Sequence, residues 1–374
     1  ADRVSDDRLI LSIHLDEYNE AAILELLDSP FNPYAMKIAL QAKTFAEILQ
    51  ASELIEKSGR SNIIFSITGK WGKFQRIFYE FFNSQAVYLY LLDPTAPGQL
   101  SLFEYTQVQA VMIQNGSLIA GIIGDQRVNE SASYEIYNYE FNENKVAVHF
   151  VPIPAADVEE AIAVIRWLNK RFEVLGFAIT SPFKKALAQS LGSHIQVINT
   201  IVLSDSRSPT FFYCQKLDAF VRYQNTDTQA LQQILTERAI PLDSTVTIHG
   251  TGACAEAFIT TLKKLGYKHI HLQGRNHSRL SELRQRFDLS DLCPTFTDLL
   301  INVTPLGLAE DDDISHLPDY GFLIDLPYDA IRTSSIVSDA EARQITCVSG
   351  MQFWYYQHVV QAEELLQLLE PDEE

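Results

Sequence analysis

The stretch Val246–Ala255, VTIHGTGACA, decides the fold of this chain. An apolar strand leads directly into a G-x-G-x-x-A turn, and the apolar helical segment Glu256–Leu265 follows. Glycines in such a turn permit a tight bend and a close approach of a pyrophosphate to the main chain, and the helix N-terminus then faces the phosphates. The stretch therefore predicts a Rossmann dinucleotide-binding domain that contacts its cofactor through Gly250, Gly252, Ala253 and Ala255.

The next strand, Ile270–Gln273, indicates which dinucleotide is bound. It is followed by Gly274, Arg275 and, further along, Arg279. Enzymes that use NAD usually carry an acidic residue here for the ribose hydroxyls, whereas arginine accommodates a 2′-phosphate. The two arginines therefore favour NADP over NAD as the cofactor.

Length and composition limit the class of protein. A chain of 374 residues predicts two or three domains. Its 47% hydrophobic and 21% charged residues exclude a disordered chain. The formal net charge of −19 argues against nucleic acid as a partner, because phosphate backbones require clustered positive charge.

The cysteines and the apolar runs indicate the cellular setting. Cys214, Cys254, Cys293 and Cys347 are widely spaced, so we expect no metal site and instead the reduced, buried thiols of a cytoplasmic protein. No stretch of about 18 apolar residues is free of charges, and the start ADRVSDD lacks a signal-peptide core. We therefore expect no association with a membrane.

Residues 1–115 alternate between strand and helix patterns. Strands are expected at Ile10–Leu15, Ala35–Leu40, Ile63–Ile67 and Val87–Leu92, each followed by a helical segment. Four such units predict half of a (β/α)8 barrel. A half-barrel leaves an apolar interior open, so either another copy covers it or the first half of the barrel is missing from this chain.

One lysine and one histidine of this region suggest chemistry. Lys37 lies in an apolar strand, where a dehydrated amine becomes a nucleophile suited to a Schiff base with a ketone. The alternative is a lysine whose amine reaches solvent from the strand end. His14, near the end of the preceding strand, is suited to proton transfer beside an imine, and otherwise is a hydrogen-bonded core histidine.

The loops after the third and fourth expected strands carry the segments GKWGKFQR, 69–76, and TAPGQ, 95–99. Arg76 can hold a carboxylate through two nitrogens, or it is simply a solvated helical arginine. With S-x-H at Ser12–His14 and K-I-A at Lys37–Ala39, the order of motifs over about residues 8–110 resembles the type I 3-dehydroquinate dehydratases. The resemblance implies that Lys37 forms the Schiff base, that His14 is the general acid/base, and that Arg76, Thr95 and Gln99 bind substrate.

Residues 118–370 resemble the shikimate dehydrogenases in a series of motifs along the whole family length. These are T-x-P-x-K at Thr180–Lys184, N-T at Asn199, N-T-D at Asn225–Asp227, the glycine turn, I-N-x-T-P-x-G at Ile301–Gly307, D-x-x-Y at Asp325–Tyr328, and Gln357. The paired serines of the family fit Ser131 and Ser133 only with one inserted residue. Ala178 and Gln196 also depart from the family pattern.

This second resemblance implies roles for individual residues. Lys184 and Asp227 form the acid/base pair. Reduction of a ketone builds negative charge on oxygen, which a nearby ammonium stabilises and protonates, while an aspartate keeps that lysine charged. The alternative is an ordinary salt bridge. The implied substrate-binding residues are Ser131, Ser133, Thr180, Asn199, Tyr328 and Gln357, and the implied cofactor-binding residues include Thr304, Leu326 and Gly350.

Together the motifs predict an α/β chain similar to the bifunctional dehydroquinate dehydratase/shikimate dehydrogenase fusions of aromatic amino acid biosynthesis. The expected divisions are a half-barrel at 1–115, a substrate-binding domain at 116–238 completed by 350–374, and the NADP domain at 239–349. The expected ligands are 3-dehydroshikimate, shikimate and 3-dehydroquinate. A non-catalytic quinate/shikimate-sensing regulator and a quinate dehydrogenase remain alternatives, and the sequence leaves open whether the chain forms a homodimer.

Overall fold

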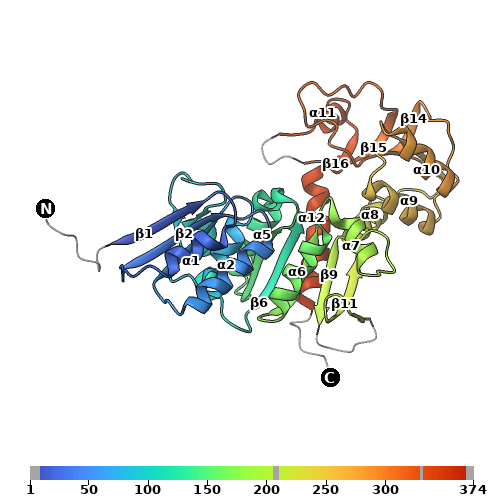
Figure 1. The fold of residues 1–374 in the computed structure, drawn as a ribbon. Coiled ribbons are helices and arrows are strands. Elements are labelled where there is room, and N and C mark those ends of the chain that lie inside the picture. Colours follow the sequence, from blue (N-terminus) through green and yellow to red (C-terminus); the bar gives the residue numbers. More distant parts are fainter. Residues whose placement is uncertain (1–8, 205–209, 329–331, 368–374) are drawn as a thin grey trace. The chain divides into compact units, whose positions relative to one another are not determined.

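The computed structural model describes residues 9–204, 210–328 and 332–367, which divide into two compact units (Figure 1). As far as the chain is described, the first unit comprises residues up to 192 together with 201–222. The second unit comprises residues 193–200 and the chain from 223 onwards. The predicted segment 1–115 therefore shares a unit with most of the predicted substrate-binding domain.

The first unit begins with a parallel three-stranded sheet in the order β1 (Ile10–Leu15), β2 (Ala35–Gln41), β3 (Ile63–Thr68). Helices α1 (Glu20–Leu27), α2 (Phe45–Ser58) and α3 (Gly72–Ile77) follow these strands, and α3 continues into the 3-10 helix η2 (Tyr79–Phe82). Three of the four predicted βα units are thus confirmed.

The fourth strand, predicted at Val87–Leu92, is shorter than predicted and lies in another sheet. β4 (Leu89–Tyr90) forms there, and it pairs with β5 (Leu100–Ser101) in a separate two-stranded sheet instead of with β3. Beside β3 a side chain replaces the main-chain ladder, because the amide of Phe65 donates to Ser84 Oγ at 2.9 Å. The Tyr88 carbonyl is likewise taken by Arg76 Nε at 3.2 Å. The Gln85 amide still donates to the Ile63 carbonyl at 2.9 Å, but further along β3 side chains take the main-chain groups, and β4 lies outside this sheet.

The first unit continues with a six-stranded sheet in the order β10-β11-β9-β8-β6-β7. Strands β6 and β7 pair in parallel, as do β6 and β8. The bounds of the strands are β6 Leu118–Gly124, β7 Val148–Pro154, β8 Glu173–Ile179, β9 Thr200–Ser204, β10 Phe212–Cys214 and β11 Ala219–Gln224. The accompanying helices are α4 Leu102–Gln107, η3 Ala110–Met112, η4 Gln126–Glu130, α5 Ala132–Glu143, α6 Val158–Asn169 and α7 Phe183–Ser190.

An aromatic core joins the two parts of the first unit. Trp167 of α6 stacks on Phe82 of η2, with ring centroids 5.0 Å apart and planes at 1°. Phe45, Phe74 and Phe78 also contact Trp167 at 5.6–6.0 Å. All five side chains are buried. Because burial of aromatic surface dominates core energetics, residues 9–115 and the α6 region share one hydrophobic core.

The second unit contains a parallel five-stranded sheet in the order β13-β12-β14-β15-β16, which confirms the Rossmann-type prediction. The strands are β12 Thr245–His249, β13 His269–Gln273, β14 Phe296–Asn302, β15 Asp319–Asp325 and β16 Thr346–Val348. The helices are α8 Thr226–Glu237, α9 Ala253–Leu265, α10 His277–Phe287, α11 Ser335–Ala342 and α12 Gly350–Leu366.

Helix α12 begins four residues before the predicted Trp354. Ser349 and Gln352 form a capping box there, in which each side chain binds the other's amide. Such a box satisfies two amides that otherwise lack partners at a helix start, so the helix extends back to Gly350.

The cysteines correct one expectation. All four are free thiols, but only Cys214 is buried, and Cys293 is exposed. Among the described residues, no helix has the length and hydropathy needed to cross a bilayer.

Candidate functional site

The glycine turn after β12 borders a cavity of about 580 Å³ in the second unit. Gly250 has φ +133°, and its amide donates to the Gln273 carbonyl at 2.8 Å. A Cβ at this position would lie 2.6 Å from Val303 Cγ2, so only glycine fits. The cavity is lined by His249, Gly250, Thr251, Gly252, Gly274, Arg275, Asn276, Val303, Thr304 and Pro305.

The N-terminus of α9 offers this cavity an anion-binding cradle. Gly252 is the N-cap, and a Cβ built on it would meet no atom within 4 Å, so space is open above it. Ala253 begins the helix and Ala255 packs in the core. Exposed Arg275 lines the same cavity and has no ion-pair partner among the described residues. A helix start, the open space above Gly252 and the Arg275 guanidinium together fit a phosphorylated dinucleotide.

Arg279, predicted to bind the 2′-phosphate, has other partners. Its guanidinium forms ion pairs with Glu256 of α9 and with Glu282. The Glu256 side chain is only 1% exposed and also accepts from Arg286 at 2.5 Å. Because a buried carboxylate requires paired charge, Arg279 stabilises the start of α9. Of the two arginines predicted to bind the 2′-phosphate, Arg275 is the one that lines the cavity.

A buried polar group lies at the ends of β14 and β15. Asn302 Nδ2 donates to Asp325 Oδ1 at 2.7 Å and to the Leu306 carbonyl at 3.1 Å. Thr304 donates to Asn302 Oδ1 through its amide at 3.1 Å and its hydroxyl at 2.8 Å. Burial raises the pKa of Asp325 to about 6, against hydrogen bonds from Ser334 and Asn302 that lower it.

The other predicted cofactor residues also lie at this end of the sheet. Leu326 donates its amide to the Asn302 carbonyl at 2.9 Å. A Cβ at Gly350 would lie 2.1 Å from the Pro327 carbonyl oxygen, so glycine permits close packing there. Tyr328 is 37% exposed, with its ring 6.4 Å from that of Trp354.

His249 is a cavity residue to which the sequence analysis gave no role. It ends β12 and contacts the His316 ring at a centroid distance of 5.3 Å. Burial lowers its pKa to about 4, and the charge of His316 acts in the same direction. His249 is therefore a neutral imidazole at pH 7. Its position in the sequence, directly before Gly250 of the glycine turn, could have indicated that it lies at the cofactor cavity.

Two predicted substrate-binding residues of the second unit, Asn199 and Gln357, converge on the start of α8. Asn199 Nδ2 donates to Thr226 Oγ1 at 2.8 Å, and the Thr226 amide donates to Asn199 Oδ1 at 2.8 Å. Gln357 Nε2 of α12 also donates to Thr226 Oγ1, at 2.8 Å. The next residue is Asp227, which is buried in the first turn of α8. The network therefore fixes the main chain that carries this carboxylate.

Two residues of the network were missed by sequence reasoning. Thr226 accepts both side-chain amides, although the motif drew attention to Asp227. Gln361 donates to the Thr200 hydroxyl at 2.7 Å and to the Asn199 carbonyl at 3.1 Å. Its spacing of four residues from Gln357 on one helix was the signal that both side chains share a face.

The first unit holds the remaining predicted substrate residues. The Thr180 amide donates to the Ile123 carbonyl at 2.9 Å, beside Gly124. A Cβ at Gly124 would lie 2.4 Å from Thr180 Cγ2 and 2.5 Å from Val128 Cγ1, so glycine brings these segments together. Lys184 is half-buried in the first turn of α7. Ser131 and Ser133 are also half-buried, and Ser131 makes no side-chain cap bond at the start of α5.

Lys37 and His14 lie on one face of the first sheet. In the parallel register Lys37 pairs with Ser12, and His14 pairs with Ala39, so the two side chains project from the same face of neighbouring strands. His14 is exposed. Lys37 Nζ lies 4.8 Å from the centroid of the Tyr88 ring, a cation–π contact.

The other predicted residues of this segment contact the protein itself. Arg76 is buried, and its Nη1 donates to the carbonyls of Ile67, Gly72 and Gly98 at 2.6–3.0 Å. Burial lowers its pKa to about 10. Gln99 Oε1 accepts from the Thr95 amide at 2.6 Å and the Thr95 hydroxyl at 3.1 Å. Nε and Nη1 of Arg76 therefore have main-chain partners, and its contact with a substrate carboxylate stays a prediction.

Comparisons with known proteins follow the same division of the chain. The family model of type I 3-dehydroquinase matches residues 29–115. The shikimate biosynthesis protein AroDE of Chlamydia muridarum is 24% identical over 369 residues, 94% of this chain and 73% of that protein. A shikimate dehydrogenase (NADP(+)) of Caldivirga maquilingensis is 26% identical over 251 residues, 63% of this chain and 86% of that protein.

A solved structure matches in fold. Shikimate 5-dehydrogenase from Thermus thermophilus, in complex with NADP(H) and shikimate, aligns with a TM-score of 0.54 at 19% identity. The alignment covers 67% of this chain and 94% of that chain.

Fold and site together define an α/β protein in which a short parallel βα sheet precedes a dehydrogenase fold with a dinucleotide-binding turn. More particularly, the chain joins a segment that matches the type I 3-dehydroquinase family model to a region with the shikimate dehydrogenase fold. The alignment with the AroDE protein of Chlamydia muridarum runs across both regions.

Proposed function

We propose that this protein is an NADP-dependent shikimate dehydrogenase that interconverts 3-dehydroshikimate and shikimate. The observation that carries the proposal is the Thr226 network, in which Asn199 and Gln357 bind the residue directly before Asp227. The network fixes the turn that carries Asp227, and the amide nitrogens of Asn199 and Gln357 each have a second hydrogen that can be donated to a hydroxyl of a polyhydroxylated ring. The names and fold of the matching proteins support the same substrate class.

The proposal gives Lys184 and Asp227 the acid/base role. The Lys184 ammonium stabilises negative charge on the reacting oxygen and supplies its proton, and the Asp227 carboxylate keeps the lysine protonated. Ser131, Ser133 and Thr180 offer hydroxyl donors, and together with Tyr328 they bind the carboxylate and hydroxyls of the substrate.

The cofactor residues fit NADP. Gly250, Gly252 and the amides at the start of α9 would hold the pyrophosphate, and Arg275 would bind the 2′-phosphate. When bound, the nicotinamide ring supplies or accepts the hydride. His249, neutral at pH 7, adds no charge beside the phosphates.

Steady-state oxidation tests the proposal. The purified chain is mixed with shikimate and NADP+, and NADPH formation is followed by absorbance. Activity that is lost with quinate or with NAD+ supports the assigned substrate and cofactor. Activity with quinate alone favours the quinate dehydrogenase alternative. Nucleotide binding without turnover of either substrate favours the sensing regulator.

A cytoplasmic location and a homodimer complete the proposal. Four free thiols are typical of a reducing compartment. Sedimentation velocity at several concentrations tests the dimer.

A further inference from the structure

The segment Asp125–Ser133 carries the two serines proposed to bind substrate. Its 3-10 helix η4 packs on β7 and β6, and Ser133 lies in the first turn of α5. Asp125 is the N-cap of η4, and its side chain accepts from the Arg127 amide at 3.0 Å. The main-chain bonds within it are short-range, with Val128 N to Asp125 O at 3.1 Å and Ser131 N to Val128 O at 3.3 Å. Because a 3-10 turn is weak by itself, tertiary contacts contribute to the position of Ser131, which joins η4 to α5.

Several polar contacts to Asp125–Ser133 come from the 3-dehydroquinase-like segment, residues 29–115. Asn129 Nδ2 donates to the Lys70 carbonyl at 2.8 Å, and Lys73 Nζ donates to the Asn129 carbonyl at 2.7 Å. Lys73 Nζ also lies 5.7 Å from the centroid of the Tyr134 ring. Asn129 precedes the two serines and Tyr134 follows them, so Lys73 contacts the chain on both sides of Ser131 and Ser133.

Lys73 is itself held in place by buried charge. It forms an ion pair with Glu104, and the two side chains are 15% and 9% exposed. Glu104 is also the capping residue of α4, because its other oxygen accepts from the Ser101 amide at 2.9 Å. A partly buried, doubly anchored pair is screened less by solvent than a surface pair, so it fixes the lysine.

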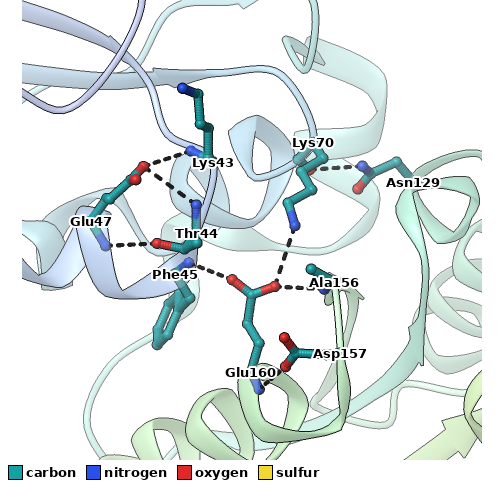
Figure 2. Close-up of polar contacts among 9 residues, drawn as sticks. All are labelled: Lys43, Thr44, Phe45, Glu47, Lys70, Asn129, Ala156, Asp157 and Glu160. Carbon is teal, nitrogen blue, oxygen red and sulfur yellow. Dashed lines mark hydrogen bonds and ion pairs between the residues drawn. The ribbon is translucent and has the colours of Figure 1, made fainter.

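The loop that supplies Lys70 and Lys73 is fixed from the other side as well. Figure 2 shows Glu160 of α6 accepting from Lys70 Nζ at 3.3 Å, from the Phe45 amide at 2.6 Å and from the Ala156 amide at 2.6 Å. One carboxylate thus joins the loops that follow β2, β3 and β7. Trp71, within the same loop, is fully buried.

We infer that the loop Gly69–Lys73 of the 3-dehydroquinase-like segment positions Ser131 and Ser133 for the dehydrogenase reaction, with Lys73 and Asn129 as positioning residues. The inference rests on the proposed function. It assigns the first segment a role in the affinity of the second for the carboxylate end of shikimate, independent of any dehydratase chemistry.

Kinetics of Lys73→Met and Asn129→Ala test the inference. Each substitution removes a hydrogen bond between the loop Gly69–Lys73 and the segment Asp125–Ser133. We therefore expect KM for shikimate to rise about tenfold, while kcat and KM for NADP+ stay within about twofold. Lys73→Arg keeps the charge and should restore most of the affinity. Lys43→Met is the matched control, since it removes an exposed lysine paired with Glu17 in the same segment.

Lys73→Met also leaves the Glu104 carboxylate without its cation, which can destabilise the fold. The double variant Lys73→Met/Glu104→Gln removes that charge and keeps a capping side chain at position 104. It should show the same rise in KM with a melting temperature near that of the wild type. A rise in the KM values for both substrates, in step with lost stability, would overturn the positioning role.

Hydrogen exchange gives a readout that does not depend on activity. Lys73→Met should speed amide exchange in a peptide covering 125–134 and leave a peptide from α9 unchanged. Unchanged exchange at 125–134 overturns the inference even in an active enzyme. A wild-type chain that fails to oxidise shikimate refutes the proposed function instead, so the two failures are distinguishable.

Discussion

Asn199 and Thr226 form a reciprocal pair, in which the Asn199 amide nitrogen donates to the Thr226 hydroxyl and the Thr226 main-chain amide donates to Asn199 Oδ1, both at 2.8 Å. The pair is buried, and it joins the segment before β9 to the first turn of α8. Thr226 thereby orients the turn that carries Asp227.

Replacing Asn199 should therefore affect both stability and activity. Asn199→Ala leaves the buried Thr226 amide without a partner, so the free energy of unfolding should fall by about 2 kcal/mol. We expect kcat/KM for shikimate to fall by about 100-fold or more, because two substrate-site groups lose their positions. Chemical denaturation and steady-state kinetics measure the two effects. Asn144→Ala, at an exposed helix end, is the control and should change neither quantity.

Lys184→Ala tests the acid/base assignment. Loss of a general acid lowers kcat by about 10²–10⁴-fold, while NADPH binding should stay nearly unchanged. Stopped-flow reduction of 3-dehydroshikimate and fluorescence titration with NADPH separate the two quantities. Lys185→Ala, at the exposed neighbouring position, is the matched control. Equal loss of binding and turnover in Lys184→Ala would argue against the assigned role.

Arg275 and Arg279 should behave differently when replaced. Arg275 lines the cavity, so Arg275→Ala should raise KM for NADP+ about tenfold or more and leave KM for NAD+ unchanged. Arg279→Ala removes one of two cations from buried Glu256, so we expect the free energy of unfolding to fall by about 1–3 kcal/mol with little change in cofactor preference. The reverse pattern would show that Arg279 is the phosphate ligand.

The pH dependence of stability should reveal Asp325. Its pKa is raised to about 6 in the folded protein, so its contribution to stability is present below the unfolded pKa near 4 and is lost as pH rises through 6. Asp325→Asn should therefore be more stable than the wild type at pH 7, by roughly 2–3 kcal/mol. Urea denaturation between pH 4 and pH 8 measures this difference.

His249 acts in the opposite direction. Its folded pKa is about 4, so its contribution is present above the unfolded pKa near 6.5 and is lost as pH falls towards 4. In the wild type the two contributions partly cancel between pH 4 and pH 6. In Asp325→Asn the His249 contribution remains, and stability should fall steadily as the pH is lowered. If Asp325→Asn changed the free energy of unfolding by the same amount at every pH, the raised pKa of Asp325 and the lowered pKa of His249 would both be contradicted.

Lys37 should form no borohydride-trappable imine with 3-dehydroquinate in this chain. On the face of the first sheet that carries Lys37, the side chain of His14 is exposed to solvent. Nε and Nη1 of Arg76, which is predicted to bind the substrate carboxylate, donate to main-chain carbonyls instead. Mass spectrometry after borohydride treatment tests this, with Lys37→Ala as the blank. A mass increase at Lys37 in the wild type would show that the first segment is catalytically competent by itself.

Part of the candidate site was predictable because it depends on local sequence. The turn at Gly250 needs a residue without a Cβ between a strand and a helix, and that pattern is visible in ten residues. The order of strands and helices likewise follows from apolar periodicity, so the bounds of β1 and α9 differ from the predictions by at most three residues.

Other features depend on partners that are distant in the chain. The sequence shows an arginine at 279, but it does not show that buried Glu256, 23 residues earlier, faces it. The sequence predicts a fourth strand, yet Ser84 and Arg76 take some of the main-chain groups that a ladder needs, and β4 pairs with β5 instead of β3. A local pattern cannot reveal such competition, because hydrogen-bond partners are chosen only after packing.

By itself, then, the sequence determined a parallel α/β chain with a dinucleotide turn and two sets of motifs, because φ preferences and apolar periodicity are local properties. Only the tertiary structure decided that the two segments share one aromatic core around Trp167, that Thr226 gathers Asn199 and Gln357, and that Lys73 contacts both sides of the paired serines. These relationships require burial and charge pairing between segments from 27 to 131 residues apart, which only the folded chain brings together.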